Sequence, residues 1–361
     1  MLKKNIQDLT KAELAQEISP AFRAKQIYHW LYHKYATSFD EMRNLPQDLR
    51  DTLKEKYLIS PLKQVMVQNS KDGSRKYLYE LHDGHTIEAV LLLMREKQYH
   101  KDGSLKHKER YTVCISSQVG CKVGCAFCLT AKGGFVRNLT AGEIVEQVRL
   151  IKKDNDIAGN RRVNLVFMGM GEPLDNLKEV VKSVKICADE EGMAIATHRQ
   201  TISTSGLSYK IEKLGKEALG VNLAISLHAV DDDLREWLMP INKAYNIQSI
   251  IEAVKAFPVN ERKRVMFEYL VIKDVNDDIS AAKKLLSLLD GIKAKVNLIY
   301  FNPYGGTQFK RPNQADMEKF QAYLTSRGLH CTIRESKGLD ISAACGQLRE
   351  QEIREGSKCL F

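Results

Sequence analysis

The sequence has no apolar segment approaching the ~20 consecutive residues that a helix needs to cross a bilayer. Its start, MLKKNIQDLTKAELAQ, is basic but has no apolar core, so we expect no secretory signal. Internal repeats and low-complexity segments are also missing. These absences predict a cytoplasmic protein without a membrane partner. In that compartment, cysteines are metal ligands, catalysts or core thiols before they are structural disulfides.

With 361 residues, of which 43% are hydrophobic and 28% charged, the chain has the composition of a globular protein. This length suffices for one large α/β domain plus a smaller appendage. The net charge of +10 and the pI near 9.0 favour polyanionic partners. The charge is dispersed, with short clusters at Arg161–Arg162 and Arg262–Lys263–Arg264, and solvated surface is the default explanation of either cluster.

Residues 1–60 have the pattern of a small helical domain. Thr10 and Glu13 form a T-x-x-E capping box, and Ser19-Pro20 and Pro46 mark two further helix starts. The polar positions of this domain are rich in Lys, Arg and His, so it could brace a nucleic acid. A helical cap packed on the main domain explains the same pattern equally well.

Residues 61–110 change to the period of two that is typical of strands. Asp72-Gly73 and Asp83-Gly84 separate three such segments, which predicts an antiparallel meander with type I′ turns. We expect Asp102-Gly103 to lie in a polar loop before the next strand. Glu88 belongs to the third segment, where the solvent face of an alternating strand explains it better than catalysis. The predicted strands cover residues 64–68, 76–81 and 86–94.

From residue 111 to residue 334, strand and helix patterns alternate regularly. Predicted strands cover 111–116, 163–167, 199–203, 221–227, 264–271 and 295–300, with a seventh at 331–334. Predicted helices cover 141–153, 177–190, 207–215, 247–257, 280–289 and 314–327. Six β/α units imply a parallel sheet covered by helices and fall short of the eight in a closed barrel. The expected fold is therefore α/β, a partial (β/α)6 barrel, followed by a tail from residue 335 to residue 361.

Three cysteines, Cys121, Cys125 and Cys128, form a C-x-x-x-C-x-x-C array in a glycine-rich loop. Thiolates bind soft metals, and three thiolates this close indicate a shared metal. A closed zinc site or a fully ligated cubane needs four ligands, and the local count stops at three. The array therefore predicts a [4Fe–4S] cluster with one iron open to an outside ligand. Zinc completed by a distant Cys or His is the alternative.

Polar motifs follow the predicted strands at the ends where α/β barrels collect functional residues. They comprise the cysteine array, Met168–Pro173, Ser203–Gly206, Ser226–His228 and Asn302-Pro303. Each motif alone is common loop chemistry, but five at corresponding strand ends predict one shared site.

The other cysteines allow more than one interpretation. Cys187 and Cys331 fall in a predicted helix and strand and are expected to be core thiols, and Cys359 has no expected role. Cys114 lies in the first strand and Cys345 in the tail, and for each a structural role is the more ordinary expectation.

The motifs together resemble a known family. Phe127 precedes the third cysteine as an aromatic does in radical S-adenosylmethionine enzymes. SSQVGC, GFVRNLT, MGMGEP, STSG, SLHA, FNP and AACGQL are similar to the RlmN/Cfr family of RNA adenine methyltransferases, with RlmN the nearer. The resemblance runs through most of the chain, most specifically from Ile87 to Gln347.

The resemblance implies a fold of the radical S-adenosylmethionine type and two molecules of S-adenosylmethionine per turnover. It assigns cofactor binding to Gly171, Glu172, Ser203, Ser226, Leu227, His228 and Asn302. It implies methylation of adenine C2 in 23S rRNA, in the peptidyl transferase region, and in certain tRNAs. Cys345 would carry the methyl group, Cys114 would release the product by forming a disulfide with Cys345, and Glu88 would handle a proton. The domain of residues 1–60 would contact RNA.

Three alternatives stay open at this point. A Cfr-type enzyme would methylate adenine C8 with the same cofactors. An iron–sulfur electron carrier or redox sensor would not be a catalyst, and a zinc-dependent RNA-binding module would hold a different metal. For the enzyme we expect a reduced flavodoxin- or ferredoxin-type electron donor and a monomer.

Overall fold

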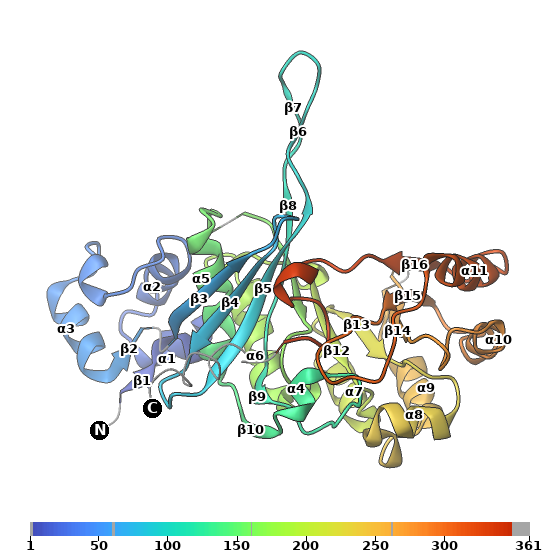
Figure 1. Cartoon of the computed structure of the whole chain (residues 1–361). Coiled ribbons are helices and arrows are strands. Elements are labelled where there is room, and N and C mark those ends of the chain that lie inside the picture. The colour runs from blue at the N-terminus through green and yellow to red at the C-terminus, as the bar shows by residue number, and fades with distance from the viewer. Residues whose placement is uncertain (1–2, 60–61, 160, 261–262, 349–361) are drawn as a thin grey trace, which may run out of the picture.

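The structure, a computed structural model, describes residues 3–59, 62–159, 161–260 and 263–348. Arg262 of the second basic cluster, Cys359 and the tail segment 349–361 lie outside these residues. A single ten-stranded sheet organises the chain in the order β16-β15-β14-β13-β12-β11-β8-β5-β4-β3 (Figure 1). Its edge strands, β16 and β3, do not pair with each other, so the sheet stays open as the expected partial barrel does.

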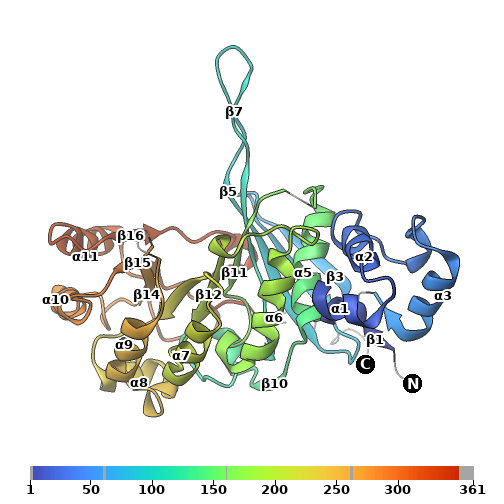
Figure 2. The same cartoon turned by 180° about the vertical axis from the view of Figure 1, so that it is seen from behind.

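Seven strands of this sheet run parallel and correspond to the seven predicted strands. They are β8 (Arg110–Cys114), β11 (Asn164–Phe167), β12 (Gln200–Thr204), β13 (Asn222–Ser226), β14 (Val265–Val271), β15 (Ala294–Tyr300) and β16 (Cys331–Arg334). The connecting helices are α5 (Ala141–Asp154), α6 (Leu177–Ala188), α7 (Ser208–Lys216), α9 (Ile247–Ala256), α10 (Ile279–Leu288) and α11 (Gln314–Thr325). Figure 2 shows α5, α6, α7 and α9 covering one face of the sheet. A short helix that was not predicted, α8 (Asp232–Leu238), follows β13 and is capped by the Asp231 side chain.

The antiparallel part comprises β3 (Lys63–Asn69), β4 (Arg75–Glu80) and β5 (Thr86–Arg95), and β5 joins it to β8. The predicted hairpins form, but the predicted turn type is wrong. A type I′ turn needs two residues with positive φ, and here only Gly73 and Gly84 have it, at 80° and 79°. Ser70 N–H donates to Ser74 and Gly73 N–H to Ser70, the pattern of a longer loop closed by a left-handed glycine.

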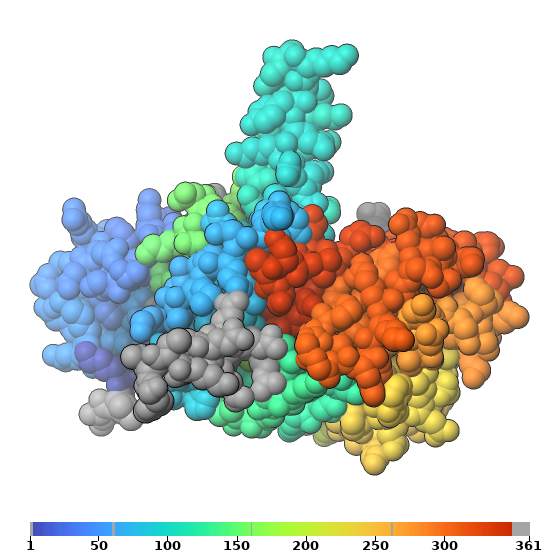
Figure 3. Space-filling view, in the orientation of Figure 1, coloured from blue at the N-terminus to red at the C-terminus, as the bar shows by residue number. Residues whose placement is uncertain are grey.

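The segment expected as a polar loop around Asp102-Gly103 instead forms a further hairpin. Strands β6 (Gln98–Tyr99) and β7 (Leu105–His107) pair antiparallel and extend β5 and β8 beyond the sheet. We call residues 95–110 the finger. Figure 1 and the space-filling view in Figure 3 show the finger standing clear of the rest of the molecule.

The N-terminal module contains α1 (Lys11–Glu17), α2 (Arg23–Tyr32) and α3 (Gln47–Lys56). The Thr10–Glu13 capping box is present, and α3 begins directly after Pro46. The module packs on α5, where the carboxylate of Asp8 accepts from the N–H of Gly142 at 2.7 Å. One hydrophobic core cluster runs from Ile6 in this module to Leu348. The four-part division of the chain made from the sequence remains a prediction.

Candidate active site

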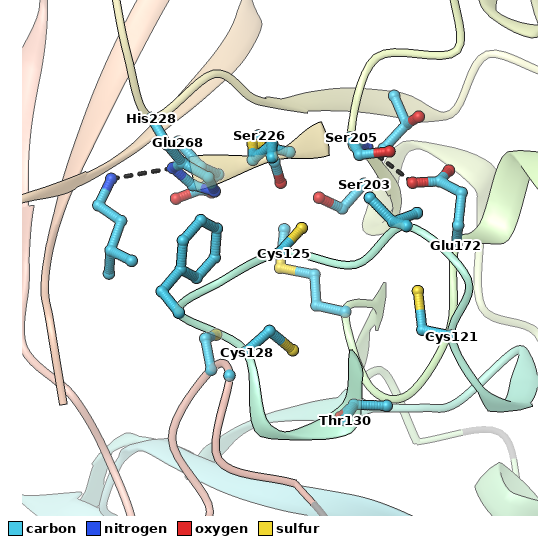
Figure 4. Close-up of a pocket in the computed structure, with 18 of the residues that line it drawn as sticks. Cys121, Cys125, Cys128, Thr130, Glu172, Ser203, Ser205, Ser226, His228 and Glu268 are labelled. Carbon is cyan, nitrogen blue, oxygen red and sulfur yellow. Dashed lines mark hydrogen bonds between the residues drawn. The ribbon is translucent and has the colours of Figure 1, made fainter. Parts of the chain in front are cut away.

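The carboxyl ends of the parallel strands surround a cavity that opens to solvent. Its wall contains the three clustered cysteines, Glu172 and Cys345, which come from separate parts of the sequence. Figure 4 shows these strand ends converging around the cavity. Four of the five predicted motifs therefore converge on this cavity, and the fifth, Asn302-Pro303, does not line it.

The cysteine loop is held at both ends by a small clamp. Strands β9 (Gln118–Gly120) and β10 (Phe135–Asn138) pair antiparallel, and the N–H of Cys121 donates to the carbonyl of Gly134 at 2.8 Å. Gly120 has a φ of 73°, and a Cβ there would lie 1.9 Å from the Gly134 oxygen, so only glycine fits. Helix α4 (Leu129–Lys132) starts directly after Cys128 and closes the loop.

The three cysteines supply the thiol groups that the sequence predicts as metal ligands at this site. Their thiols point into the cavity from one loop (Figure 4). Burial raises the pKa of Cys121 to about 12 and the pKa values of Cys125 and Cys128 as well. In the described part of the chain, no group of three or more His, Cys, Asp or Glu side chains is arranged to hold a single metal ion.

Glu172 is fixed by its backbone neighbours. The N–H groups of Leu174 and Ser205 donate to its two carboxylate oxygens at 3.0 and 2.7 Å. A carboxylate has about four acceptor positions, so it can still accept hydrogen bonds from an ammonium group. Burial raises the pKa of Glu172, and these hydrogen bonds oppose the rise. Gly171 has a φ of 98° and brings the backbone against Gln118, where a Cβ would lie 2.5 Å from the Gln118 Cβ.

His228 lies at the end of β13 with a positive φ of 60°. Its Nδ1 accepts from the N–H of Leu270 at 3.0 Å, and its ring packs edge-on against Phe127 with centroids 5.0 Å apart. Burial lowers the pKa of His228 to about 3, so the ring is neutral and carries its proton on Nε2. Together with Ser203 and Ser226, the His228 side chain gives the cavity neutral polar groups.

Arg235 is a positioning residue that the sequence did not reveal. Its buried guanidinium donates to the carbonyls of Ser226 and Leu227, and to that of Ser205, which ties the ends of β12 and β13 together. The same group donates to the side chain of Asn242 at 2.8 Å. The polar ends of these two strands are therefore held in one fixed arrangement.

The tail places Cys345 beside the cysteine loop. The N–H of Leu129 donates to the carbonyl of Gly346 at 2.7 Å, and the Thr130 hydroxyl donates to the carbonyl of Leu348 at 2.6 Å. Cys345 itself is exposed and forms part of the cavity wall.

A second cavity adjoins the first and contains the other predicted working cysteine. Cys114, Cys345 and Arg334 all line it, and both Cys345 and Arg334 also line the first cavity. Burial raises the pKa of Cys114 to about 12; interaction with Cys345 adds to the rise and Arg334 opposes it. All described cysteines are free thiols.

Three predicted site residues are placed elsewhere. Leu227 is fully buried, and Asn302 accepts from Arg311 at 2.7 Å and donates to Ser336 at 3.0 Å. Glu88 is only 3% exposed and forms an ion pair with Lys76 at 3.2 Å, so its interpretation as a solvent-facing residue is wrong. None of the three lines either cavity.

Glu268 and Arg334 line the first cavity but were not predicted. Glu268 is 3% exposed, and its Oε2 has no hydrogen-bond partner among the described residues. A lone carboxylate inside the apolar strand VMFEYLV was the available sequence signal. An unsatisfied buried acceptor beside neutral polar groups and three thiols suits an iron–sulfur cluster with a polar ligand such as S-adenosylmethionine.

Two family models match the sequence. That of the Radical SAM superfamily matches residues 115–286, and that of the Ribosomal RNA large subunit methyltransferase N-terminal domain matches residues 4–59. A crystal structure of a radical SAM methyltransferase from Sphaerobacter thermophilus superposes with a TM-score of 0.87 at 42% identity, over 96% of this chain and 99% of that one. Fold and site thus define a radical S-adenosylmethionine enzyme.

Full-length relatives identify the family. The chain is 83% identical to the dual-specificity RNA methyltransferase RlmN of a Sulfurovum species, over 97% of this chain and 98% of the relative. It is 67% identical to the protein of the same name from a Nitratiruptor species, over 96% and 98%. The chain belongs to the RlmN family of radical S-adenosylmethionine RNA methyltransferases.

This membership confirms that the protein is an enzyme and that it uses a [4Fe–4S] cluster and S-adenosylmethionine. The electron-carrier and zinc-module alternatives are therefore wrong, and the RlmN side of the resemblance is confirmed over the Cfr side. Among the described residues, no helix is both long and apolar enough to span a bilayer.

Proposed function

We propose that this enzyme methylates C2 of an adenosine in the peptidyl transferase region of 23S rRNA and of an adenosine in certain tRNAs. The observation that carries the proposal is that Cys345 shares one cavity wall with the three clustered thiols and Glu172. A cysteine there can accept a methyl group and present it to a base at the open mouth. The close relatives are dual-specificity RNA methyltransferases by name, which supports RNA as the substrate.

In this proposal Cys121, Cys125 and Cys128 hold the cluster, which when bound supplies the electron that cleaves S-adenosylmethionine. Glu172 accepts hydrogen bonds from the ammonium group of S-adenosylmethionine, and Gly171 lets the backbone approach this cofactor closely. Ser203, Ser226 and His228 contact the remaining polar groups of the cofactor. Leu227 and Asn302 keep the cofactor role that the resemblance gives them, although neither lines the cavity.

Two cysteines are needed because adenine C2 is an electrophilic carbon without a lone pair, so ordinary methyl transfer cannot reach it. Cys345 would receive a methyl group on sulfur from one S-adenosylmethionine. The radical chemistry that the bound cluster and a second S-adenosylmethionine would supply removes one hydrogen atom from that methyl group, and its carbon then bonds to adenine C2. The C2 hydrogen would leave as a proton, with the remaining electron returning to the cluster. Cys114, as a thiolate, then attacks the Cys345 sulfur. The disulfide forms as the bond between that sulfur and the transferred carbon breaks, and this carbon takes up a proton, which leaves a methyl group on the released RNA. The pKa of Cys114, raised to about 12, means that its thiol must lose a proton first, and Glu88 is the proposed proton acceptor.

Further parts of the proposal concern the surroundings of the site. We place the enzyme in the cytoplasm, as a monomer reduced by a flavodoxin- or ferredoxin-type protein. The N-terminal module, which packs on α5, contributes RNA contacts in addition to its structural role.

The substrate assignment is tested by mass spectrometry of nucleosides after reaction with unmodified 23S rRNA and tRNA transcripts. We expect 2-methyladenosine in both. Formation of 8-methyladenosine would instead assign the Cfr-type reaction, and absence of any methylated adenosine would contradict the proposal.

The two working cysteines are separated by their different points of action. Cys345→Ala is expected to give neither methylated protein nor methylated RNA, because the methyl acceptor is gone. Cys114→Ala is expected to load the methyl group and then stall with RNA covalently attached to Cys345. A denaturing gel after nuclease digestion, with peptide mass spectrometry, shows the attached nucleotide.

The control variants Cys187→Ala and Cys331→Ala remove thiols that lie in the core, away from both cavities. They should keep iron content and activity at a packing cost of about 1 kcal/mol. Normal turnover by Cys114→Ala, or RNA methylation by Cys345→Ala, would refute the two-cysteine assignment.

A further inference from the structure

The finger, residues 95–110, is a part of the molecule that contributes nothing to the core. Every residue from 94 to 108 is exposed. An isolated two-stranded hairpin is marginally stable in water, and this one gains no buried face in return for its ordering. Packing within the chain therefore does not explain why this segment extends from the sheet.

The charge of the finger indicates the kind of partner. It contains six Lys or Arg residues, two His and only three acidic residues. Asp102 accepts from Ser104 within the turn, and Glu109 pairs with Arg161 at 3.1 Å, so two of the three carboxylates are already engaged. Among the described residues, no carboxylate pairs with Lys101, Lys106 or Lys108. The side-chain charge of the finger that is not paired with an opposite charge is therefore positive.

The finger also exposes apolar side chains. Tyr99 is 60% exposed and Leu105 is 44% exposed, and the two are cross-strand partners, so their side chains share a face. An exposed aromatic ring among unpaired lysines combines base stacking with phosphate contacts, which is how proteins bind single-stranded RNA.

The finger connects directly to the site. Its strands continue β5 and β8, and Val90, Leu92 and Met94 of β5 line the second cavity together with Cys114. Met94 precedes the first finger residue, Arg95, so the cavity wall ends where the finger begins. Figure 1 shows the red chain after β16 passing beside β5, and Cys345 of this segment lines the second cavity together with Leu92 and Met94.

We propose that the finger is an RNA-binding arm that holds the substrate strand along β5 and so presents its adenine to Cys345. This inference rests on the proposed function, because it takes RNA as the substrate. It adds a surface that neither the N-terminal module nor the cofactor cavity provides.

The test compares the wild-type holoenzyme with the triple variant Lys101→Ala/Lys106→Ala/Lys108→Ala, using an unmodified 23S rRNA transcript as the probe. We expect RNA affinity to fall about tenfold or more, and the slope of log affinity against log salt to decrease by about 2 to 3, since each lost phosphate contact removes roughly one unit. Cleavage of S-adenosylmethionine without RNA, driven by dithionite, should be unchanged. The matched control is Lys255→Ala/Lys283→Ala/Lys284→Ala, three exposed lysines on α9 and α10, and it should behave as wild type.

A second comparison tests the aromatic contact. Tyr99→Ala should weaken binding of the same transcript by about fivefold, as expected for loss of one stacked base. Tyr209→Ala, which removes a ring that is 56% exposed on α7, should not.

Unchanged affinity and salt slope in the lysine variant would overturn the proposal. So would normal RNA binding with slow turnover only when a protein reductant replaces dithionite, because the arm would then serve the electron donor. Failure of the wild type to form 2-methyladenosine is a separate result: it contradicts the proposed function, whereas RNA binding by the finger is measured independently of it.

Discussion

At the scale of single residues, His228 has a protonation state that its surroundings fix. Leu270 N–H donates to Nδ1, which leaves Nε2 as the donor toward the cavity. Burial lowers its pKa to about 3, against an ordinary value near 6.5. The imidazole can therefore orient a polar ligand, but it is not a general acid near neutral pH.

This environment predicts a pH dependence of stability. Because the pKa of His228 is lower in the folded protein than in the unfolded chain, the unfolded chain binds the proton more tightly. The contribution of His228 to the free energy of unfolding is therefore fully present above about pH 6.5 and is lost as the pH falls toward 3. Between about pH 7 and pH 5 the loss is about 2 kcal/mol. Denaturant unfolding of the cluster-free protein measures it, with His228→Asn for comparison, because Asn tolerates the positive φ and can accept the Leu270 hydrogen bond. Equal pH dependence in both proteins would show that His228 titrates normally.

Single residues could be assigned to the site from the sequence only where they belong to a motif. Glu172 and His228 line the cavity as expected, because they end strands whose carboxyl ends meet. Glu88 was misjudged because β5 is covered on both faces, and period-two alternation assumes that one face meets water. Arg235 and Arg334 had no motif, since their roles arise from elements that only the fold brings together.

At the scale of elements, the tail is tied down at two places. Near Cys345 it binds the cysteine loop, and further upstream it binds the turn between β3 and β4. There the Asp340 carboxylate accepts from the Ser70 hydroxyl at 2.6 Å and the Lys71 N–H at 3.0 Å, while Asp72 accepts from the Gly338 N–H at 2.9 Å. These contacts hold the tail across the sheet and so fix where Cys345 lies.

We predict that Asp340→Ala slows methyl loading of Cys345 by about fivefold, because two hydrogen bonds that position the tail are lost. Iron content should stay at the wild-type value, since Asp340 lines neither cavity. Intact-protein mass spectrometry follows the methyl group with time, and Asp290→Ala, an exposed aspartate after α10, is the control. Loss of iron together with methyl loading would show that the tail contact supports the loop instead.

Strands and helices were predicted well where their apolar pattern extends over several consecutive residues. All seven parallel strands were found, and the central ones such as β14 (VMFEYLV) are nearly continuous buried apolar runs. The edge strand β16 also has the predicted bounds. The finger was missed because its residues are polar and exposed, so no period of two distinguishes it from a loop. The turn type was missed because Asp-Gly is compatible with several turns.

At the scale of the whole molecule, the N-terminal module and the barrel share one core. Buried residues of α2 and α5 belong to the same cluster. The ion pair between Arg149 and Glu146 is fully buried beneath the module, where Gln7 donates to Glu146 and Arg149 donates to the carbonyl of Ala36. The sequence left open whether residues 1–60 are a cap or an RNA-binding part, and the packing establishes the first role without excluding the second.

We therefore predict that deletion of residues 1–60 abolishes the soluble fold, so that RNA binding and cofactor cleavage are lost together. The deletion would expose the apolar face of α5 to water, and the burial of apolar surface is the dominant favourable contribution to folding. A milder variant tests the same interface: a Cβ at Gly142 would lie 2.3 Å from Asn5 Nδ2, so Gly142→Ala should lower Tm by about 2 °C or more. Gly305→Ala, where nothing lies within 4 Å, should leave Tm unchanged. A truncated protein that unfolds cooperatively and still cleaves S-adenosylmethionine would show instead that the barrel is an independent folding unit, and that the shared core is a contact between two separate ones.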